Sequence, residues 1–166
     1  MRVRRRARFL PEPGAHLNDL AAALPFLLPK AIVWAEGEAD RALREGEPLS
    51  PERRIFAEAA GVRRSERIRL LVTDALPEPD DPALSAAARQ AGLLGPGMIG
   101  LTLGYAVFIR RGRVSRRTLS HELRHVHQYE AAGGIAAFLP LYFAQIVEVG
   151  YGAAPLEADA RAHETD

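Results

Sequence analysis

The segment His121-Glu122-Leu123-Arg124-His125 is the strongest indication of the fold and the chemistry of this chain. In a helix, side chains four residues apart lie on one face, so both imidazoles can bind a single zinc ion. The glutamate between them is then placed to act as a general base toward a water molecule. The segment therefore predicts a zinc site on a helix, with a third ligand supplied by another part of the chain.

The residues around this segment favour a helix from about Ser115 to Ala132. Apolar side chains recur at helical spacing, and Gly133-Gly134 is a typical helix end. A second apolar helix is expected over residues 135–149, where Pro140 can kink it, and a last helix from Pro155 through Glu164. The C-terminal half is therefore predicted to be helical.

The residues before the motif helix favour strands. Residues 98–110 are rich in Ile, Leu, Tyr, Val and Phe and are broken at Gly104, which is typical of two strands or one bent strand. Residues 67–73 alternate in hydrophobicity and predict another strand. Helices are expected over residues 29–44, 51–60 and 83–91. The predicted fold class is α+β, a small β-sheet followed by a helical, zincin-like half that carries the motif.

Length and composition predict one globular domain. The chain has 166 residues, of which 48% are hydrophobic and 26% are charged. We expect residues 16–166 to form this domain and residues 1–15 to be a flexible Arg-rich tail. The net charge of +1 gives no indication of a nucleic-acid partner. The chain has no cysteine, so a disulfide, a Cys-based zinc site and a thiol nucleophile are excluded.

The N-terminal region resembles a secretory signal only superficially. Five arginines within residues 2–8 precede an apolar stretch over residues 20–35, but Pro11-Glu12-Pro13-Gly14 separates the two, and no small-residue cleavage site follows. Prolines and Lys30 interrupt the apolar stretch, which is short for a membrane span. We expect a buried or surface-lying helix in a cytoplasmic protein. Contact of the arginines with anionic lipid is the alternative.

The last helix offers the third metal ligand. Glu157 lies 32 residues beyond His125, and one apolar helix separates them. A helix that returns antiparallel to the motif helix can bring its carboxylate to the two imidazoles. Ala160, one turn later, is small enough to let the two helices approach closely. Rival ligands on the same segment are Asp159, Glu164 and His163.

The motif, followed by Gln128 and by Glu157-Ala158-Asp159-Ala160, resembles the gluzincin clan of zinc metallopeptidases. It is similar to small bacterial metallopeptidase-like domains, including those linked to extracellular contractile injection systems. In those domains a strand like residues 100–109 leads into the motif helix. The resemblance covers about residues 95–165. It implies Zn²⁺ held by two histidines and a glutamate, here His121, His125 and Glu157.

This resemblance also implies a reaction, the hydrolysis of peptide bonds in a peptide or protein substrate with Glu122 as general base. One position departs from the pattern. Thermolysin-like members carry an Asp four residues after the ligand Glu, where it orients a zinc-ligand histidine, and this chain has Arg161 there. We therefore expect another group, or a backbone carbonyl, to orient the imidazole.

The residue that stabilises the tetrahedral oxyanion is expected to be a tyrosine. Tyr151 is preferred over Tyr129 and Tyr142 because it stands in a glycine-flanked turn. An extended substrate is expected to pair with the free edge of the strand region over residues 98–110. Two other functions fit the same residues. One is a catalytically inactive metal-binding scaffold that holds a partner, and the other is a peripheral membrane protein.

Overall fold

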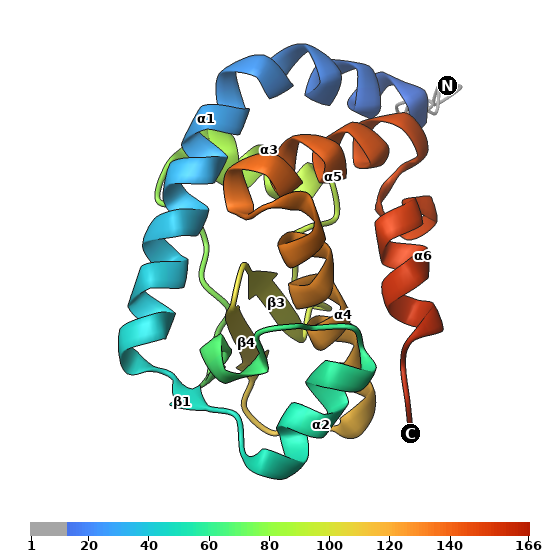
Figure 1. The fold of residues 1–166 in the computed structure, drawn as a ribbon. Helices are drawn as coiled ribbons and strands as arrows, with labels where there is room; N and C mark the ends of the chain where they lie inside the picture. The colour runs from blue at the N-terminus through green and yellow to red at the C-terminus, as the bar shows by residue number, and fades with distance from the viewer. Residues whose placement is uncertain (1–12) are drawn as a thin grey trace, which may run out of the picture.

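A computed structural model describes residues 13–166, with side chains from residue 19 onward. The strands are β1 (Glu47–Pro48), β2 (Arg69–Thr73), β3 (Gly100–Leu103) and β4 (Ala106–Arg110). The α-helices are α1 (Pro13–Glu45), α2 (Pro51–Ala59), α3 (Pro82–Gln90), α4 (Arg116–Ala132), α5 (Ile135–Val149) and α6 (Pro155–Ala162). Two short 3₁₀ helices are η1 (Ser65–Arg67) and η2 (Tyr151–Ala153). The fold is α+β with a helical C-terminal half, which confirms the predicted class (Figure 1).

The strands form one mixed sheet in the order β1-β2-β4-β3. β2 pairs parallel to β4, while β1 and β3 each pair antiparallel to their neighbours. Residues 98–110 therefore form two strands that turn at Gly104, whose φ of 64° suits glycine. β3 is an edge strand. Among the described residues, one side of β3 therefore has no strand partner, and β3 lies next to the helix that carries the motif.

Both faces of β4 are covered by helices. On one face, Ala106 and Phe108 pack in a buried cluster that contains side chains of α1. On the other face, Val107 and Ile109 pack in a buried cluster that contains side chains of α2 and α4. All four side chains are fully buried. A strand buried on both faces reads as a continuous apolar run, which is what the sequence shows here. The sheet thus forms a rigid layer between α1 and the motif helix.

The N-terminal helix is longer than the sequence predicted. α1 begins at Pro13 rather than near Pro29, and Pro25 and Pro29 lie inside it. Both prolines are exposed, so the carbonyls that they leave without a helical donor face solvent. Figure 1 shows α1 bending in this region, as proline in a helix requires. Of the predicted tail over residues 1–15, the first twelve residues lie outside the described part of the chain, and the rest begin α1.

Local signals set the ends of the motif helix as expected. The Ser115 side chain accepts a hydrogen bond from the backbone N–H of Thr118, and Gly133 closes α4 with a left-handed φ of 101°. α5 then leaves α4 at an angle of 112°. α6 returns along α4, with Ala160 fully buried. α6 ends at Ala162, two residues before the predicted end.

Replacing Leu123 by Ala should lower the free energy of unfolding by about 2–5 kcal/mol, because the side chain of Leu123 is fully buried between α4 and the sheet. Urea denaturation followed by circular dichroism measures this change. Ile55→Ala, on a side chain that is 64% exposed, is the matched control and should change stability by less than about 0.5 kcal/mol. Equal losses in both variants would show that the packing of α4 on the sheet does not dominate stability.

Candidate metal centre

Three side chains predicted as metal ligands come together. His121 and His125 project from α4 and Glu157 from α6, and one ligand atom of each lies within 4.8 Å of the others. The two Nε2 atoms are 3.2 Å apart. Glu157 places Oε1 3.3 Å from Nε2 of His125 and Oε2 3.6 Å from Nε2 of His121. This group can bind a metal ion.

Glu157 is held as a buried carboxylate. Only 1% of the residue is exposed. Burial alone raises its pKa, but the hydrogen bond and charge of His125, the hydroxyl of Tyr142 and the charge of His121 together lower the pKa to about 2. Tyr142 donates to Oε1 at 2.7 Å. The carboxylate is therefore ionised at neutral pH and ready to act as a ligand.

A chain of hydrogen bonds fixes His125 from behind. Its Nδ1 lies 2.8 Å from Oε1 of Gln128, whose Nε2 donates to Oδ2 of Asp159 at 2.7 Å and to the carbonyl of Leu156. Asp159 in turn accepts two hydrogen bonds from Arg124, at 2.7 and 3.0 Å. Asp159, a rival ligand in the sequence, thus supports the site from outside the cluster of ligand atoms.

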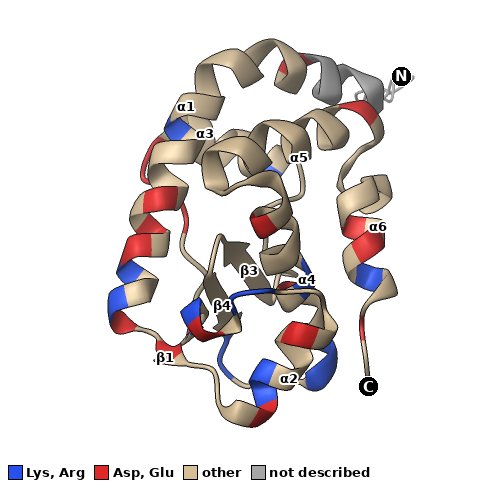
Figure 2. Cartoon of the chain, viewed as in Figure 1, with Lys and Arg blue, Asp and Glu red and all other residues tan. Residues whose placement is uncertain are grey.

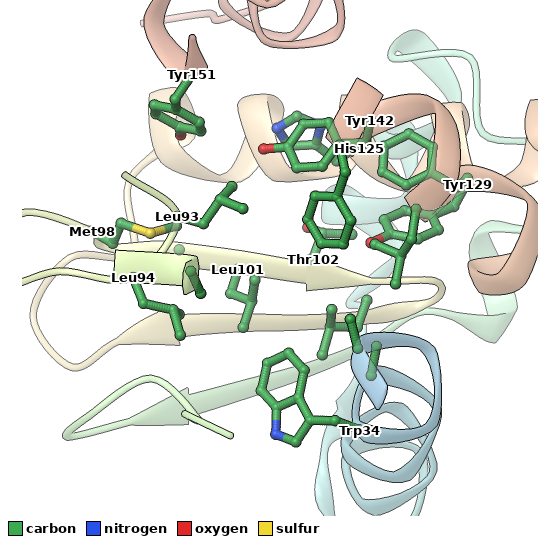
Figure 3. A pocket seen from close by; sticks show the side chains of 18 of the residues that line it. Trp34, Leu93, Leu94, Met98, Leu101, Thr102, His125, Tyr129, Tyr142 and Tyr151 are labelled. Atoms are coloured by element: carbon green, nitrogen blue, oxygen red, sulfur yellow. The ribbon is translucent and has the colours of Figure 1, made fainter. Parts of the chain in front are cut away.

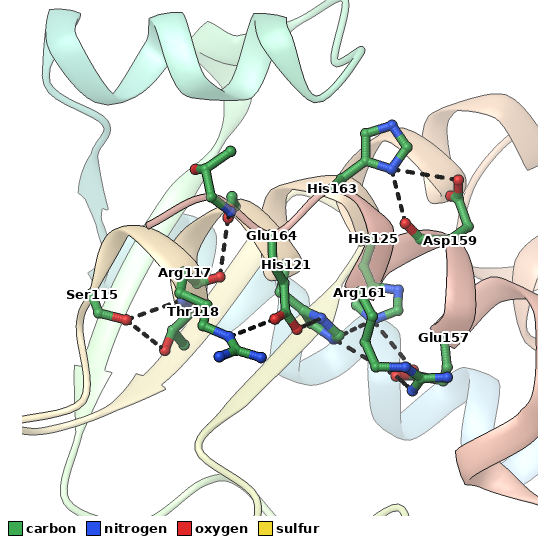
Figure 4. Close-up of polar contacts among 12 residues, drawn as sticks. Ser115, Arg117, Thr118, His121, His125, Glu157, Asp159, Arg161, His163 and Glu164 are labelled. Carbon is green, nitrogen blue, oxygen red and sulfur yellow. Dashed lines mark hydrogen bonds and ion pairs between the residues drawn. The ribbon is translucent and has the colours of Figure 1, made fainter.

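Glu164 takes the role that Arg161 cannot take. Its Oε1 lies 3.1 Å from Nδ1 of His121, and its Oε2 accepts a hydrogen bond from Arg117 at 2.5 Å (Figure 4). A carboxylate behind a ligand imidazole fixes the ring and its tautomer. The third rival, His163, instead contacts Asp159 through Nδ1. The expected orienting group is therefore present, seven residues after Glu157 rather than four.

These contacts leave three lone pairs facing one point. A carboxylate and an amide oxygen only accept hydrogen bonds, so Nδ1 of each histidine carries the proton and Nε2 carries the lone pair. Both Nε2 atoms then point toward Glu157, whose buried Oε2 has no hydrogen-bond partner among the described residues. The guanidinium of Arg161 lies 3.8 Å from Oε2 and offsets part of its charge, but it leaves this oxygen without a hydrogen bond. The donor set fits a metal ion, since one ion can accept all three lone pairs.

The acid–base properties of His125 agree with that conclusion. Burial lowers the pKa of His125, but the carboxylates of Glu157 and Glu122 outweigh this effect, and the pKa is raised. A raised pKa means that the surroundings stabilise a positive charge on the ring. The protein therefore favours positive charge at this point of the structure.

Glu122 lies beside the ligand group but does not belong to it. Its Oε2 accepts a hydrogen bond from Thr102 on β3 at 2.7 Å. Burial raises its pKa, and the nearby charges of His125 and His121 lower it in part. Gly100 leaves room for this side chain, because a Cβ there would lie 2.2 Å from Oε1 of Glu122. A carboxylate with a raised pKa beside a metal group is suited to accept and release a proton.

The three candidate tyrosines occupy different positions. Tyr142 is committed to Glu157, and Tyr129 is buried against Phe138 in the core. Burial raises the pKa of all three phenols, so each keeps its proton at neutral pH. Tyr151 in η2 is half-buried and lines both hollows that reach the ligand group. It is therefore the phenol best placed to donate to a bound molecule.

Two hollows meet at the ligand group. The inner one is an apolar cavity of about 100 Å³, bounded by His125 and Tyr142 on one side and by Trp34 of α1 on the other (Figure 3). The outer one is an open cleft of about 650 Å³ beside the loop over residues 95–99. His121, Glu122 and Tyr151 line both. A molecule in the cleft can therefore contact His121 and the Glu122 carboxylate together.

Comparisons with protein-family models, with curated proteins and with solved structures find no match for this chain. The assignment of its function rests on the residues of the site and their arrangement.

Sequence reasoning overlooked two residues of β3. Thr102 and Gly100 contact Glu122 across the sheet edge, and only the pairing of β3 beside α4 brings them there. Gln128 stood on the histidine stripe of the helix, and its spacing of three residues from His125 is the signal that could have revealed its role.

Replacing Glu164 by Ala should weaken metal binding about ten- to hundredfold, because the imidazole of His121 loses the carboxylate that fixes it. Competition with a metal-sensitive dye measures the dissociation constant. Asp166→Ala removes an exposed acid two residues away and should leave that constant unchanged. Equal affinity in Glu164→Ala and the wild type would exclude the positioning role of Glu164.

Proposed function

We propose that this protein is a zinc-dependent metallopeptidase of the gluzincin kind. His121, His125 and Glu157 hold the ion, and Glu122 is the general base. The observation that carries the proposal is the convergence of three acceptor atoms with a proton-accepting carboxylate at the meeting point of a cavity and an open cleft. The gluzincin assignment is supported by the position of the third ligand, a Glu on a later helix.

The types of ligand atom support zinc as the ion. Tetrahedral ligands about 2.0–2.1 Å from one ion lie about 3.3–3.4 Å from each other. The two Nε2 atoms are 3.2 Å apart, close to this value, and they lie 3.3 and 3.6 Å from different oxygens of the Glu157 carboxylate. Two imidazoles and one carboxylate are also a donor set of catalytic zinc sites, whereas Ca²⁺ and Mg²⁺ prefer oxygen ligands.

Zinc in such a site supplies Lewis acidity, which polarises a carbonyl group and lowers the pKa of water. The protein's own residues carry the proton. Glu122 removes it from the attacking water and delivers it to the leaving amine. Thr102 donates a hydrogen bond to Oε2 of Glu122. The other oxygen, Oε1, then accepts and releases the proton. The pKa of Glu122 is raised toward neutral pH. A general base transfers protons most efficiently when its pKa lies near the pH of the reaction.

Tyr151 donates its phenolic hydrogen to the oxyanion that forms on the substrate carbonyl. It keeps its proton at neutral pH and lines the cleft opposite the ligands. The peptide lies along β3, the edge strand, and adds hydrogen bonds to its free side. The adjoining cavity, with its apolar walls, takes a hydrophobic side chain of the substrate.

Purified protein should contain one zinc ion per chain, and Glu157→Gln should weaken zinc binding at least about a hundredfold, more than loss of a second-shell group does. This substitution preserves the shape of the side chain and removes its charge. Metal analysis by mass spectrometry and a competition titration measure both quantities. Asp159→Asn serves as the rival-ligand control and should retain stoichiometric zinc. Loss of zinc in Asp159→Asn but not in Glu157→Gln would refute the assigned ligand set.

Replacing Glu122 by Gln should lower the rate of peptide hydrolysis about 10²- to 10⁴-fold while zinc remains bound, because only the general base is lost. Mass spectrometry of a mixed peptide library after incubation shows the cleavage products. Chelation should stop hydrolysis in the wild type, and added Zn²⁺ should restore it. Stoichiometric zinc without cleavage of any peptide by the wild type would instead identify an inactive metal-binding scaffold.

A further inference from the structure

The N-terminal half of α1 exposes apolar side chains where a surface helix normally exposes polar ones. Phe26 is 78% exposed and Val33 is 71% exposed, and with Ala22 and Pro29 they form an outward stripe at helical spacing. The most apolar 18-residue window of α1 is only 17% buried. The outward face of a helix in water is ordinarily polar. This face of α1 is therefore suited to contact with an apolar partner.

α5 also exposes apolar side chains. It packs against α1 and exposes Leu141 and Val149, 57% and 46% respectively. Figure 2 shows that α5 and the upper part of α1 carry almost no charged residues, in contrast to the lower part of α1. Lys30 is one of the few, and it is paired with Asp81 at 2.6 Å. We call the four side chains Phe26, Val33, Leu141 and Val149 the apolar α1–α5 surface.

Positive charge is concentrated in the sequence next to this surface. The first 35 residues contain six basic and two acidic residues, whereas the remaining residues contain 16 basic and 19 acidic ones. Five of the six are the arginines at positions 2, 4, 5, 6 and 8, which immediately precede α1. A basic segment that precedes an exposed apolar helix in the sequence is complementary to a surface that is anionic outside and apolar underneath.

We propose that the apolar α1–α5 surface docks on an anionic lipid bilayer, to which the basic N-terminal sequence is complementary in charge. Phe26 and Val33 enter the boundary between headgroups and acyl chains, where apolar side chains leave water. This function is separate from zinc binding and from peptide hydrolysis. It also brings the protein to a membrane, where its substrate would then be found.

Two other occupants of this surface fit the structure less well. In a second copy of the chain the first 35 residues are equally basic, with six basic and two acidic residues, so this region offers no complementary charge. A membrane-spanning α1 would have to leave the fold, because Ala31, Ala35 and Ala39 on its inner face are buried in the main core. A helix lying on the membrane keeps this core intact.

Vesicle co-sedimentation of the full chain tests the proposal. The wild type should bind vesicles of phosphatidylcholine with 30% phosphatidylglycerol and should bind pure phosphatidylcholine at least about tenfold more weakly, because each basic residue near an anionic surface adds attraction. Phe26→Asp with Val33→Asp should weaken binding at least about tenfold, since two apolar side chains no longer leave water. Replacement of the five arginines by Gln should weaken it to a similar extent.

Ile55→Asp is the matched control. Ile55 on α2 is 64% exposed and lies outside the apolar α1–α5 surface, so this variant should bind vesicles like the wild type. Zinc content should be the same in all variants, which separates a membrane defect from a defect in the metal site. Glu157→Gln should conversely lose zinc and keep vesicle binding.

Three results would overturn the proposal. They are an absence of binding to the anionic vesicles, undiminished binding of the Phe26→Asp, Val33→Asp variant, and a wild-type dimer in solution that this variant converts to a monomer. Wild-type protein that resists extraction from vesicles at alkaline pH would show a spanning helix instead and would also contradict docking at the surface.

Discussion

The structure depends on the placement of one buried carboxylate. Glu157 sits almost without solvent contact between two imidazoles, and an isolated charge in such a position would destabilise the fold. The close contact of α6 with α4 imposes this placement, and the fully buried Ala160 permits the contact. The features around it compensate for the buried charge. Tyr142 donates a hydrogen bond to Oε1 of Glu157. The two imidazoles lie 3.3 and 3.6 Å from the carboxylate, where a cation would bind all three side chains.

Because both imidazoles must face Glu157, residues outside the ligand group are needed to hold the two rings in place. Each imidazole is fixed by a different route. Gln128, Asp159 and Arg124 form one route across the α4–α6 contact, whereas Glu164 and Arg117 form the other. Arg124 also donates to the carbonyl of Ala60 at the end of α2. The orientation of the ligands is therefore built into the packing of three helices rather than into the motif alone.

Much of the fold and of the site could be predicted from the sequence because the signals are local. Ser115 and Gly133-Gly134 mark the ends of α4, and the four-residue spacing of the histidines fixes their common face. The predicted start of α1 near Pro29 is wrong, because a proline suits a helix start but exposed prolines can also lie within a bent helix. The contacts of Thr102 and Glu164 could not be predicted, because they depend on elements that meet only in the folded chain.

The shortness of α6 makes this helix dependent on its contacts with the rest of the protein. Eight residues are too few for a helix to persist alone in water, so α6 holds its form through what it touches. A ligand that binds only the folded state adds stability that grows with the logarithm of its free concentration, about 2.7 kcal/mol at a hundred times the dissociation constant. An ion bound between α4 and α6 would hold α6, the last helix, against α4. The free energy of unfolding would then rise and fall with the supply of metal.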